Sequence, residues 1–237
     1  MTVVAGSLEG RVVAVAGAAG NLGPTVVARL LAEGARVCAC GRDRASLSAL
    51  VESVGEIGTD VVDLLDPDAT RGWAAELARR HGHVDGLVHL VGGWRGGAPI
   101  EDAPLADWDD LSALLVRTVQ NATQAFALQL IEAGGRFVLV STSQAQAPTH
   151  PNAAYAAAKA ASEAWTLALA NRFRGTGATA NLVVVGAIVT PSMRAESPDK
   201  DFATFTPAEE IADAIAYLCS DATASMNGQR LTLRGAA

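Results

Sequence analysis

Short apolar runs that suit β-strands alternate with segments of helical period along this chain, and this alternation limits the possible folds more than any other feature. The first run, Val12–Ala16, is followed by a glycine-rich turn and then by Pro24–Glu33, where Val26 and Leu30 share a helix face. Strand, helix and strand joined by short connections imply a parallel sheet with helices on both faces. The strand runs are apolar throughout, as is typical of a sheet buried on both sides.

The same pattern predicts seven strands and six helices. The strands are expected at Val12–Ala16, Arg36–Cys40, Val61–Leu64, Gly86–Val91, Arg136–Ser141, Asn181–Val185 and Arg230–Leu233. The helices are expected at Pro24–Glu33, Ser46–Val54, Asp68–Arg80, Asp107 to about Glu132, Asn152–Phe173 and Pro207–Ser220. The polar stretch Pro191–Phe205, which contains two prolines, is expected to be irregular and long enough to act as a mobile lid.

Length and composition agree with one large α/β domain. The 237 residues are 50% hydrophobic, so the chain can bury a sizeable core, and we expect residues 1–237 to form a single Rossmann-type domain with a doubly wound parallel sheet of about seven strands. The net charge is −7 and no basic cluster opposes it, which argues against nucleic acid or an anionic membrane as partner. The sequence shows no secretory signal and no apolar run long enough for a membrane-spanning helix.

Cysteine usage points to a reducing compartment. The three cysteines Cys38, Cys40 and Cys219 cannot all pair, so we expect reduced thiols and a cytoplasmic protein. Cys38 and Cys40 lie two residues apart on one predicted strand, but no second pair of ligands accompanies them. We therefore predict no metal site.

The turn after the first strand has the character of a phosphate cradle. Its residues are Gly17, Ala18, Ala19, Gly20, Asn21, Leu22 and Gly23. Glycines let a backbone approach a pyrophosphate, and the following helix N-terminus offers free N–H groups and a partial positive charge. The position between a strand and a helix favours a dinucleotide site, although a tight turn without a ligand would have the same glycines.

The end of the second strand bears on the choice of cofactor. Sites for NAD place an acid there for the ribose 2′-hydroxyl, whereas sites for NADP place an arginine nearby. Here Gly41 is followed by Arg42, which favours NADP(H), with Arg44 as a second cation. NAD(H) stays possible because Asp43 could turn inward. Asp63, after the third strand, is expected to bind the adenine amino group, with a turn or capping acid as the alternative.

Tyr155 and Lys159 are spaced i and i+4, so they share a helix face. A nearby ammonium favours the phenolate, and this spacing predicts that Lys159 lowers the pKa of Tyr155 so that the phenol can act as an acid–base group. The cluster Ser141, Thr142 and Ser143 follows the fifth strand and could supply a hydroxyl for a substrate oxygen. Each feature alone could equally be incidental helix or strand-end polarity.

Together these features resemble the short-chain dehydrogenase/reductase family over nearly the whole chain. The likeness includes the glycine turn, Asp63, the Tyr155/Lys159 pair and the segment Gly186–Pro191. It implies a Rossmann domain that assembles as a homotetramer or dimer. It also implies that Lys159 holds the nicotinamide ribose, that Ile188 and Thr190 contact the nicotinamide carboxamide, and that Gly92 belongs to the cofactor site.

Several positions depart from the family pattern. The serine thirteen residues before the tyrosine is Thr142, for which Ser141 or Ser143 could substitute, and the position of the family's catalytic asparagine is Leu115. The Asn-Asn-Ala-Gly segment is here His89–Gly92. The stretches Val91–Gly97 and Asp201–Pro207 resemble the dihydropteridine reductase branch, in which Trp94 could stack on a planar substrate or serve as a core or subunit contact.

The resemblance and the residues together predict an NADP(H)-dependent oxidoreductase of a small carbonyl, alcohol or C=N substrate. Tyr155 is the expected acid–base, with Lys159 and Thr142 as its partners. A dihydropteridine-reductase-like enzyme and a cofactor-binding protein with little activity, suggested by Leu115, are the alternatives. The predicted Asn152–Phe173 helix and the helix from Asp107 are apolar enough to pair with copies of themselves.

Overall fold

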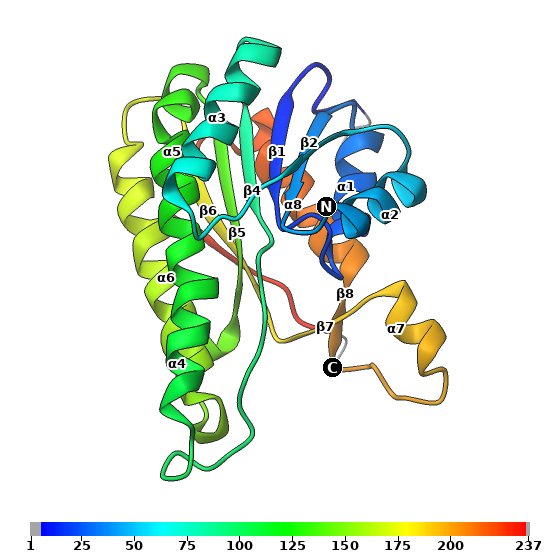
Figure 1. Ribbon diagram of the computed structural model, residues 1–237, viewed down its shortest axis with the longest axis vertical. Helices are drawn as coiled ribbons and strands as arrows, with labels where there is room; N and C mark the ends of the chain where they lie inside the picture. Colours follow the sequence, from blue (N-terminus) through cyan, green and yellow to red (C-terminus); the bar gives the residue numbers. More distant parts are fainter. Residues whose placement is uncertain (1–5, 236–237) are drawn as a thin grey trace.

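In the computed structural model, which describes residues 6–235, a seven-stranded parallel sheet runs through the molecule with helices on both faces (Figure 1). The strand order is β3-β2-β1-β4-β5-β6-β9. The chain therefore builds outward from β1 in one direction and then returns to build from its other side. This reversal puts a switch point between β1 and β4, where open α/β sheets bind ligands. The predicted fold is confirmed.

The strands and helices agree with the predicted order. The strands of the main sheet are β1 Val12–Ala16, β2 Arg36–Gly41, β3 Gly58–Val61, β4 Gly86–His89, β5 Arg136–Thr142, β6 Thr179–Val185 and β9 Arg230–Thr232. The helices are α1 Gly23–Ala32, α2 Arg44–Val54, α3 Pro67–His81, α4 Leu105–Leu111, α5 Thr118–Ala133, α6 Ala153–Arg172, α7 Pro191–Glu196 and α8 Ala208–Cys219. A separate two-stranded sheet pairs β7 Ala187–Val189 with β8 Phe205–Pro207.

Two hydrophobic cores lie on opposite faces of the sheet. Val12 and Ala14 of β1 join the core under α3, α5 and α6, whereas Val13 and Val15 join the core under α1 and α8. Figure 1 shows these two helix layers on either side of the strands. Because successive strand residues point to opposite faces, a strand needs apolar residues at every position to serve both cores, which explains the unbroken apolar runs.

The third strand was predicted at Val61–Leu64, and this is wrong. Strand β3 ends at Val61, because its register with β2 pairs Gly41 with Val61 and β2 goes no further. Val62 and Leu64 lie beyond the strand and enter the core beside α3. β3 lies at the edge of the sheet, and most of its residues are exposed. Its sequence therefore contains no apolar run by which the strand could have been predicted.

The single long helix expected from Asp107 to about Glu132 is three connected stretches. Helix α4 begins at Leu105, directly after Pro104, and Ser112–Arg117 is π-helical before α5 continues. A π-helical stretch turns more loosely than an α-helix and is frequent at functional sites. Here it contains Leu115, the position at which the family pattern has asparagine.

The stretch Pro191–Phe205 is more ordered than its sequence predicted. Helix α7 begins at Pro191 and is capped by Thr190, whose Oγ1 accepts from the Met193 N–H at 3.3 Å. The missed strands β7 and β8 pair across the segment and tie its two ends together. Only residues 197–204 between α7 and β8 lack a helix or strand.

The three cysteines are buried as protonated thiols. Cys38, Cys40 and Cys219 are free and buried. Burial raises the pKa of Cys38 to about 11 and those of Cys40 and Cys219 to about 12, so all three are thiols rather than reactive thiolates. Within residues 6–235, no group of three or more ligating side chains could hold a metal ion, and no helix is long and apolar enough to cross a membrane.

Candidate active site

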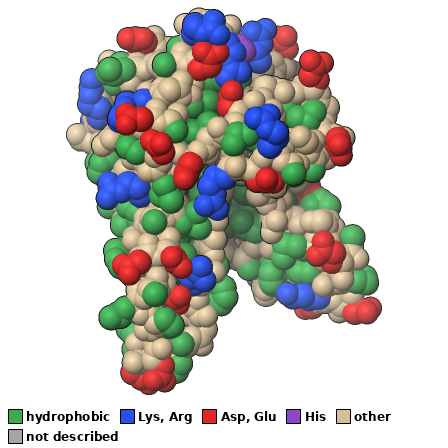
Figure 2. Space-filling model, viewed as in Figure 1, with side chains coloured by type: hydrophobic (Ala, Val, Ile, Leu, Met, Phe, Trp, Pro, Cys, Tyr) green, Lys and Arg blue, Asp and Glu red, His purple; other side chains and the backbone are tan. Residues whose placement is uncertain are grey.

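A cavity of about 1040 Å³ opens at the carboxyl ends of the central strands. Figure 2 shows a hollow below the middle of the molecule, between the arm that carries α4 and the lobe that carries α7. Its lining brings together nearly all the site residues predicted from the sequence. These are Gly17, Gly20, Asn21, Leu22, Gly23, Arg42, Asp63, Gly92, Thr142, Tyr155, Lys159 and Ile188.

Each glycine of the first turn lies in different surroundings, which explain why a residue without a side chain stands there. Gly17 has φ +76°, and a Cβ on it would meet the Val91 nitrogen at 2.8 Å. A Cβ on Gly23 would lie 1.7 Å from the Ala18 carbonyl oxygen, so only glycine lets α1 begin against this turn. A Cβ on Gly20 would meet only the Gly17 oxygen, at 3.3 Å. Gly20 therefore presents bare backbone to the cavity, where a phosphate could approach.

The N-terminus of α1 also lines the cavity and has no side-chain cap. Leu22 occupies the capping position and cannot accept a hydrogen bond, Pro24 follows in the first turn, and that turn contains no acidic residue. A helix start without a cap or an acid keeps its positive end of the dipole available to an anionic ligand. The turn and the helix together therefore fit the pyrophosphate of a dinucleotide.

The residues after β2 distinguish the two cofactor hypotheses. The Asp43 carboxylate caps α2 and accepts from the Ser46 N–H at 2.7 Å and the Ser46 hydroxyl at 2.6 Å. These hydrogen bonds lower the pKa of Asp43. Arg42 and Asp43 both line the cavity, and the Arg42 side chain is exposed, whereas Arg44 does not line it. The Asp43 carboxylate is thus already bound to Ser46, while the Arg42 guanidinium has no hydrogen bond or ion pair with the described residues.

Asp63 lies two residues beyond β3 and lines the cavity. Its Oδ1 accepts from the Leu65 N–H at 3.0 Å, which closes a local turn. The side chain therefore serves the turn, and its second oxygen accepts no hydrogen bond from residues 6–235. Both interpretations of this acid, as a turn residue and as a cavity ligand, are compatible with the geometry.

Tyr155 and Thr142 meet at the cavity wall, but the phenol is not acidified by its neighbour. Burial raises the pKa of Tyr155, and the opposing hydrogen bond of the Thr142 side chain is the smaller influence. The expectation that the Lys159 ammonium lowers the pKa of Tyr155 is therefore wrong in this structure. The physical reason is that the half-buried phenolate would lose more hydration than the surroundings return. The phenol keeps its proton at neutral pH.

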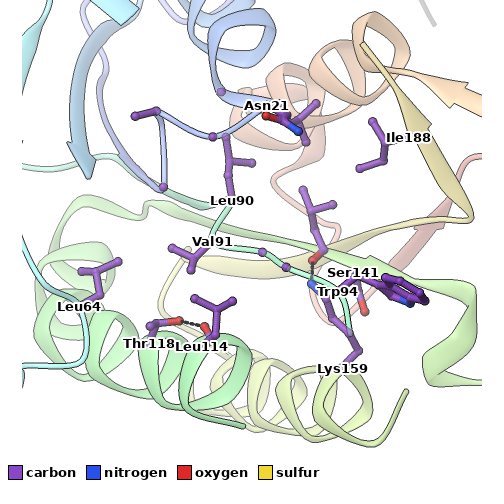
Figure 3. A pocket seen from close by; sticks show the side chains of 18 of the residues that line it. Asn21, Leu64, Leu90, Val91, Trp94, Leu114, Thr118, Ser141, Lys159 and Ile188 are labelled. Carbon is purple, nitrogen blue, oxygen red and sulfur yellow. Dashed lines mark hydrogen bonds between the residues drawn. The ribbon is translucent and has the colours of Figure 1, made fainter. Parts of the chain in front are cut away.

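Lys159 extends into the cavity from α6, on the side opposite Asn21 and Ile188 (Figure 3). Its side chain is buried, and Nζ donates to the Val140 carbonyl oxygen at 2.9 Å. Burial lowers the pKa of Lys159 to about 8, against the attraction of the Glu163 carboxylate. The ammonium is thus charged at neutral pH but loses its proton within about one unit above it.

The three hydroxyls after β5 have different surroundings. The Ser141 hydroxyl donates to Glu163 Oε1 at 2.6 Å, and Ser143 is exposed and does not line the cavity. Thr142 is the one of the three that is both in the lining and next to Tyr155. The alternative hydroxyls left open by the sequence are therefore less well placed than Thr142.

Glu163 is the residue that the sequence analysis missed. Its carboxylate is buried and accepts from Ser141, from Gln146 Nε2 at 2.9 Å and from Arg230 Nε at 2.7 Å. It therefore joins α6 to β5, to the loop after β5 and to β9. The signal was available, because Glu163 follows Lys159 by four residues and so extends the Tyr155–Lys159 face by one more turn.

Two departures from the family pattern lie next to Lys159. His89, at the end of β4, is buried, and neither ring nitrogen has a hydrogen-bond partner among the described residues. Burial and the nearby Lys159 charge lower the pKa of His89 to about 3, so the imidazole is neutral. Leu115 is buried, and its carbonyl oxygen accepts from the Ser162 hydroxyl at 2.8 Å.

The residues expected around a nicotinamide are only partly in the cavity. Gly92 and Ile188 line it, whereas Thr190 does not. The Thr190 hydroxyl is buried at the start of α7, where it also lies 2.9 Å from the Ser192 hydroxyl. Its observed contacts are therefore those of a helix cap rather than of a cavity side chain.

The chain is similar to known oxidoreductases along its whole described length. The profile of the family described as "Enoyl-(Acyl carrier protein) reductase" matches residues 17–235. Gluconate 5-dehydrogenase of Gluconobacter oxydans (strain 621H) is 31% identical over 244 residues, which cover 97% of this chain and 95% of the relative. The 3-oxoacyl-[acyl-carrier-protein] reductase FabG of Escherichia coli (strain K12) is 26% identical, with 97% and 98% covered.

A solved structure shows the same fold. A putative short chain dehydrogenase from Pseudomonas syringae superposes with a TM-score of 0.87 at 26% identity, and the match covers 98% of this chain and 97% of that one. The family match over residues 17–235 includes the glycine turn at one end and the strand β9 near the other. The cavity described above therefore belongs to the part of the chain that these proteins share.

The buried carboxylate yields a test of how the site is held together. Glu163→Gln keeps the shape of the side chain but removes the charge that faces Arg230, so we expect the free energy of unfolding to fall by about 2 kcal/mol. This is less than for a fully buried pair, because Arg230 is 38% exposed. Urea denaturation measures the change. The matched control is Glu76→Gln, which removes an exposed partner of Arg79 and should leave the unfolding midpoint unchanged. Equal midpoints for both variants would contradict the assignment.

Proposed function

The chain belongs to the short-chain dehydrogenase/reductase family of NAD(P)-dependent oxidoreductases that act on carbonyl and alcohol groups, and we propose that it is an NADP(H)-dependent reductase of a small carbonyl compound. The observation that carries this proposal is the cavity in which the glycine turn, Arg42, Tyr155 and Lys159 come together. We also propose a cytoplasmic location, which suits its buried free thiols.

We propose that the dinucleotide lies across the carboxyl ends of β1 and β4. Gly20 and the uncapped start of α1 would hold the pyrophosphate, and Asp63 would meet the adenine. Arg42 would bind the 2′-phosphate of NADP(H). Asp43 is already bound to Ser46, which supports NADP(H) over NAD(H) as the preferred cofactor. Gly92 and Ile188 would border the nicotinamide, and Thr190 would act through α7 rather than by direct contact.

The proposed chemistry is a proton transfer by this chain beside a hydride transfer. A bound nicotinamide supplies or accepts the hydride at the substrate carbon. Tyr155 donates its phenolic proton to the carbonyl oxygen, and the raised pKa of Tyr155 keeps that proton in place at neutral pH. The Thr142 hydroxyl orients the same oxygen. The Lys159 ammonium, fixed by Val140, holds the ribose and stabilises negative charge as it develops on the phenol.

A cofactor-binding protein with little turnover is the alternative that Leu115 suggests. In the family pattern an asparagine at this position anchors a water molecule that relays protons to the lysine. Here the Leu115 side chain has no polar atom that could hold such a water, and the Leu115 carbonyl oxygen already accepts one hydrogen bond from Ser162. We propose that Tyr155 works nonetheless, because its own proton suffices for each reduction and can be regained from solvent through the open cavity.

A pterin substrate is the narrower alternative. The stretches Val91–Gly97 and Asp201–Pro207 resemble dihydropteridine reductases, which reduce a conjugated C=N system. Of the two stretches, only the first contributes residues to the cavity lining. A quinonoid dihydropterin therefore belongs in the panel of substrates to be assayed with NADPH.

Tyr155→Phe separates an enzyme from a passive binder. Removal of the phenolic oxygen removes the proposed proton donor, so we expect the kcat for ketone reduction to fall at least about 10³-fold while the Kd for NADPH stays within about twofold. NADPH titration against intrinsic tryptophan fluorescence gives the Kd, and NADPH consumption gives the rate. A rate unchanged by this variant would favour the binding protein, and a chain that binds no NADPH would end the proposal.

Arg42→Ala tests the cofactor assignment. Loss of a charge-assisted contact to the 2′-phosphate should weaken NADPH binding by about 10- to 100-fold, with little effect on NADH. Arg44→Ala is the matched control, since Arg44 is a neighbouring exposed arginine outside the cavity lining. Equal losses of NADPH and NADH affinity in Arg42→Ala would show that the guanidinium does not read the phosphate.

We also propose that the chain forms a homo-oligomer, a tetramer or a dimer, through α4 and α5. Leu105, Trp108 and Leu128 on these helices are 89%, 42% and 66% exposed, which is unusual for large apolar side chains on one pair of helices. Light scattering at micromolar concentration should give at least twice the chain mass, and Leu105→Glu with Leu128→Glu should lower it. A monomer mass for the unchanged chain would refute the assembly.

A further inference from the structure

Trp94 is the largest apolar side chain that the cavity exposes to solvent. It follows β4 in the long connection to α4, and 60% of its surface is accessible. It also lines the cavity, as do Leu114, Asn152 and Tyr155. A core role for this tryptophan is therefore wrong. An exposed indole in the same cavity as the proposed proton donor is a feature that the fold itself does not require.

The indole is held in one orientation by a chain of hydrogen bonds. Nε1 donates to Asn152 Oδ1 at 2.8 Å, and Asn152 Nδ2 donates to the Thr149 hydroxyl at 2.8 Å. The Thr149 hydroxyl in turn donates to Gln144 Oε1 at 3.0 Å. Gln144 lies two residues beyond Thr142. The backbone N–H of Gln144 donates to the Thr142 Oγ1 at 3.4 Å. The chain thus joins the indole to the hydroxyl that faces Tyr155.

The backbone around the indole is fixed as well. The Gly97 N–H donates to the Pro151 carbonyl oxygen at 2.7 Å, which fastens this connection to the segment just before α6. Gly96 has φ +157°, and a Cβ on it would lie 2.5 Å from the same Pro151 oxygen. A Cβ on Gly93 would lie 2.7 Å from a Leu114 methyl carbon. Glycine at position 96 lets the connection approach the segment before α6 this closely, whereas a side chain at position 93 would displace the end of the Leu114 side chain.

The charges of the cavity are distributed unevenly. Of its lining side chains, Arg42, Asp43 and Asp63 follow β2 and β3, and Lys159 is bound to Val140. The lining residues joined to Trp94 by the hydrogen-bonded chain, Asn152 and Gln144, are neutral, and the charge of the adjacent Arg95 is paired with Asp110 outside the lining. Such a wall favours uncharged ligands, because an anion there would lose its hydration without gaining a cationic partner.

We propose that Trp94 is a specificity-determining residue and that the substrates are uncharged ring compounds whose carbonyl is conjugated with a flat π-system. Such a ring lies against the indole face while its carbonyl oxygen reaches Thr142 and Tyr155. The inference rests on the proposed function. The carbonyl carbon gains a hydride from NADPH, its oxygen gains the Tyr155 proton, and NADP⁺ is left as the oxidised product. Because the hydrogen-bonded chain fixes the indole beforehand, stacking requires little further ordering.

A matched pair of ketones tests the inference. 1-Tetralone and 1-decalone share one fused ten-carbon skeleton, but only 1-tetralone has its carbonyl conjugated with an aromatic ring. We expect the kcat/KM for 1-tetralone to exceed that for 1-decalone about tenfold, Trp94→Leu to bring the ratio close to one, and Trp94→Phe to retain most of it. Ile100→Ala is the control, since Ile100 is an exposed apolar residue of the same connection that lies outside the cavity lining.

A binding measurement accompanies the kinetics. The chain has four tryptophans, and the indole N–H signal of Trp94 in a ¹⁵N NMR spectrum is identified by its loss in Trp94→Phe. With NADP⁺ present, 1-tetralone should shift this signal at concentrations at which 1-decalone does not. A ratio unchanged in Trp94→Leu, or a signal that neither ketone moves, would overturn the inference while leaving NADPH binding and the Tyr155 dependence intact. Loss of NADPH binding in the unchanged chain would instead refute the proposed function.

Discussion

A positive charge buried at the end of β5 is the constraint on which the rest of the site depends. Lys159 is removed from water, and this burial disfavours its ammonium strongly enough to bring its pKa to about 8. Two groups stabilise the charge: the Val140 carbonyl oxygen, which accepts a hydrogen bond from Nζ, and the Glu163 carboxylate, which lies one helical turn further along α6. The same carboxylate binds Ser141 and Arg230, so the strand ends and the helix that form the cavity wall are held to one another by the groups that stabilise the charge.

This arrangement gives Tyr155 and Lys159 different tasks from those that their spacing alone suggests. The i and i+4 positions indicate a phenol acidified by its neighbour, yet the buried surroundings of Tyr155 raise its pKa. A protonated phenol beside a charged ammonium is the pair needed for carbonyl reduction, because the phenol must have a proton to give. The ammonium then stabilises the phenolate after the transfer, rather than before it.

The sequence predicted the fold well because the β-branched runs and the glycine turn are local signals. Gly17 and Gly23 could be interpreted from their positions alone, and the structure supplies the reason in their contacts with Val91 and Ala18. Strand β3 was misplaced because its pairing with β2, and not its own apolarity, sets its end. The chain of hydrogen bonds from Trp94 to Gln144 and the partners of Glu163 join segments far apart in sequence, so no local pattern could have indicated them.

The claim that can be measured most directly is that Tyr155 keeps its phenolic proton at neutral pH. The chain has two tyrosines, so Tyr217→Phe leaves Tyr155 as the sole source of phenolate absorbance. In the protein without cofactor, an ultraviolet titration of this variant should show less phenolate at about pH 10 than the half expected of a free phenol, because burial raises the pKa of Tyr155 above its ordinary value. Phenolate absorbance that rises between pH 7 and about pH 8, while Lys159 is still charged, would show that the cation does acidify the phenol and would contradict this account.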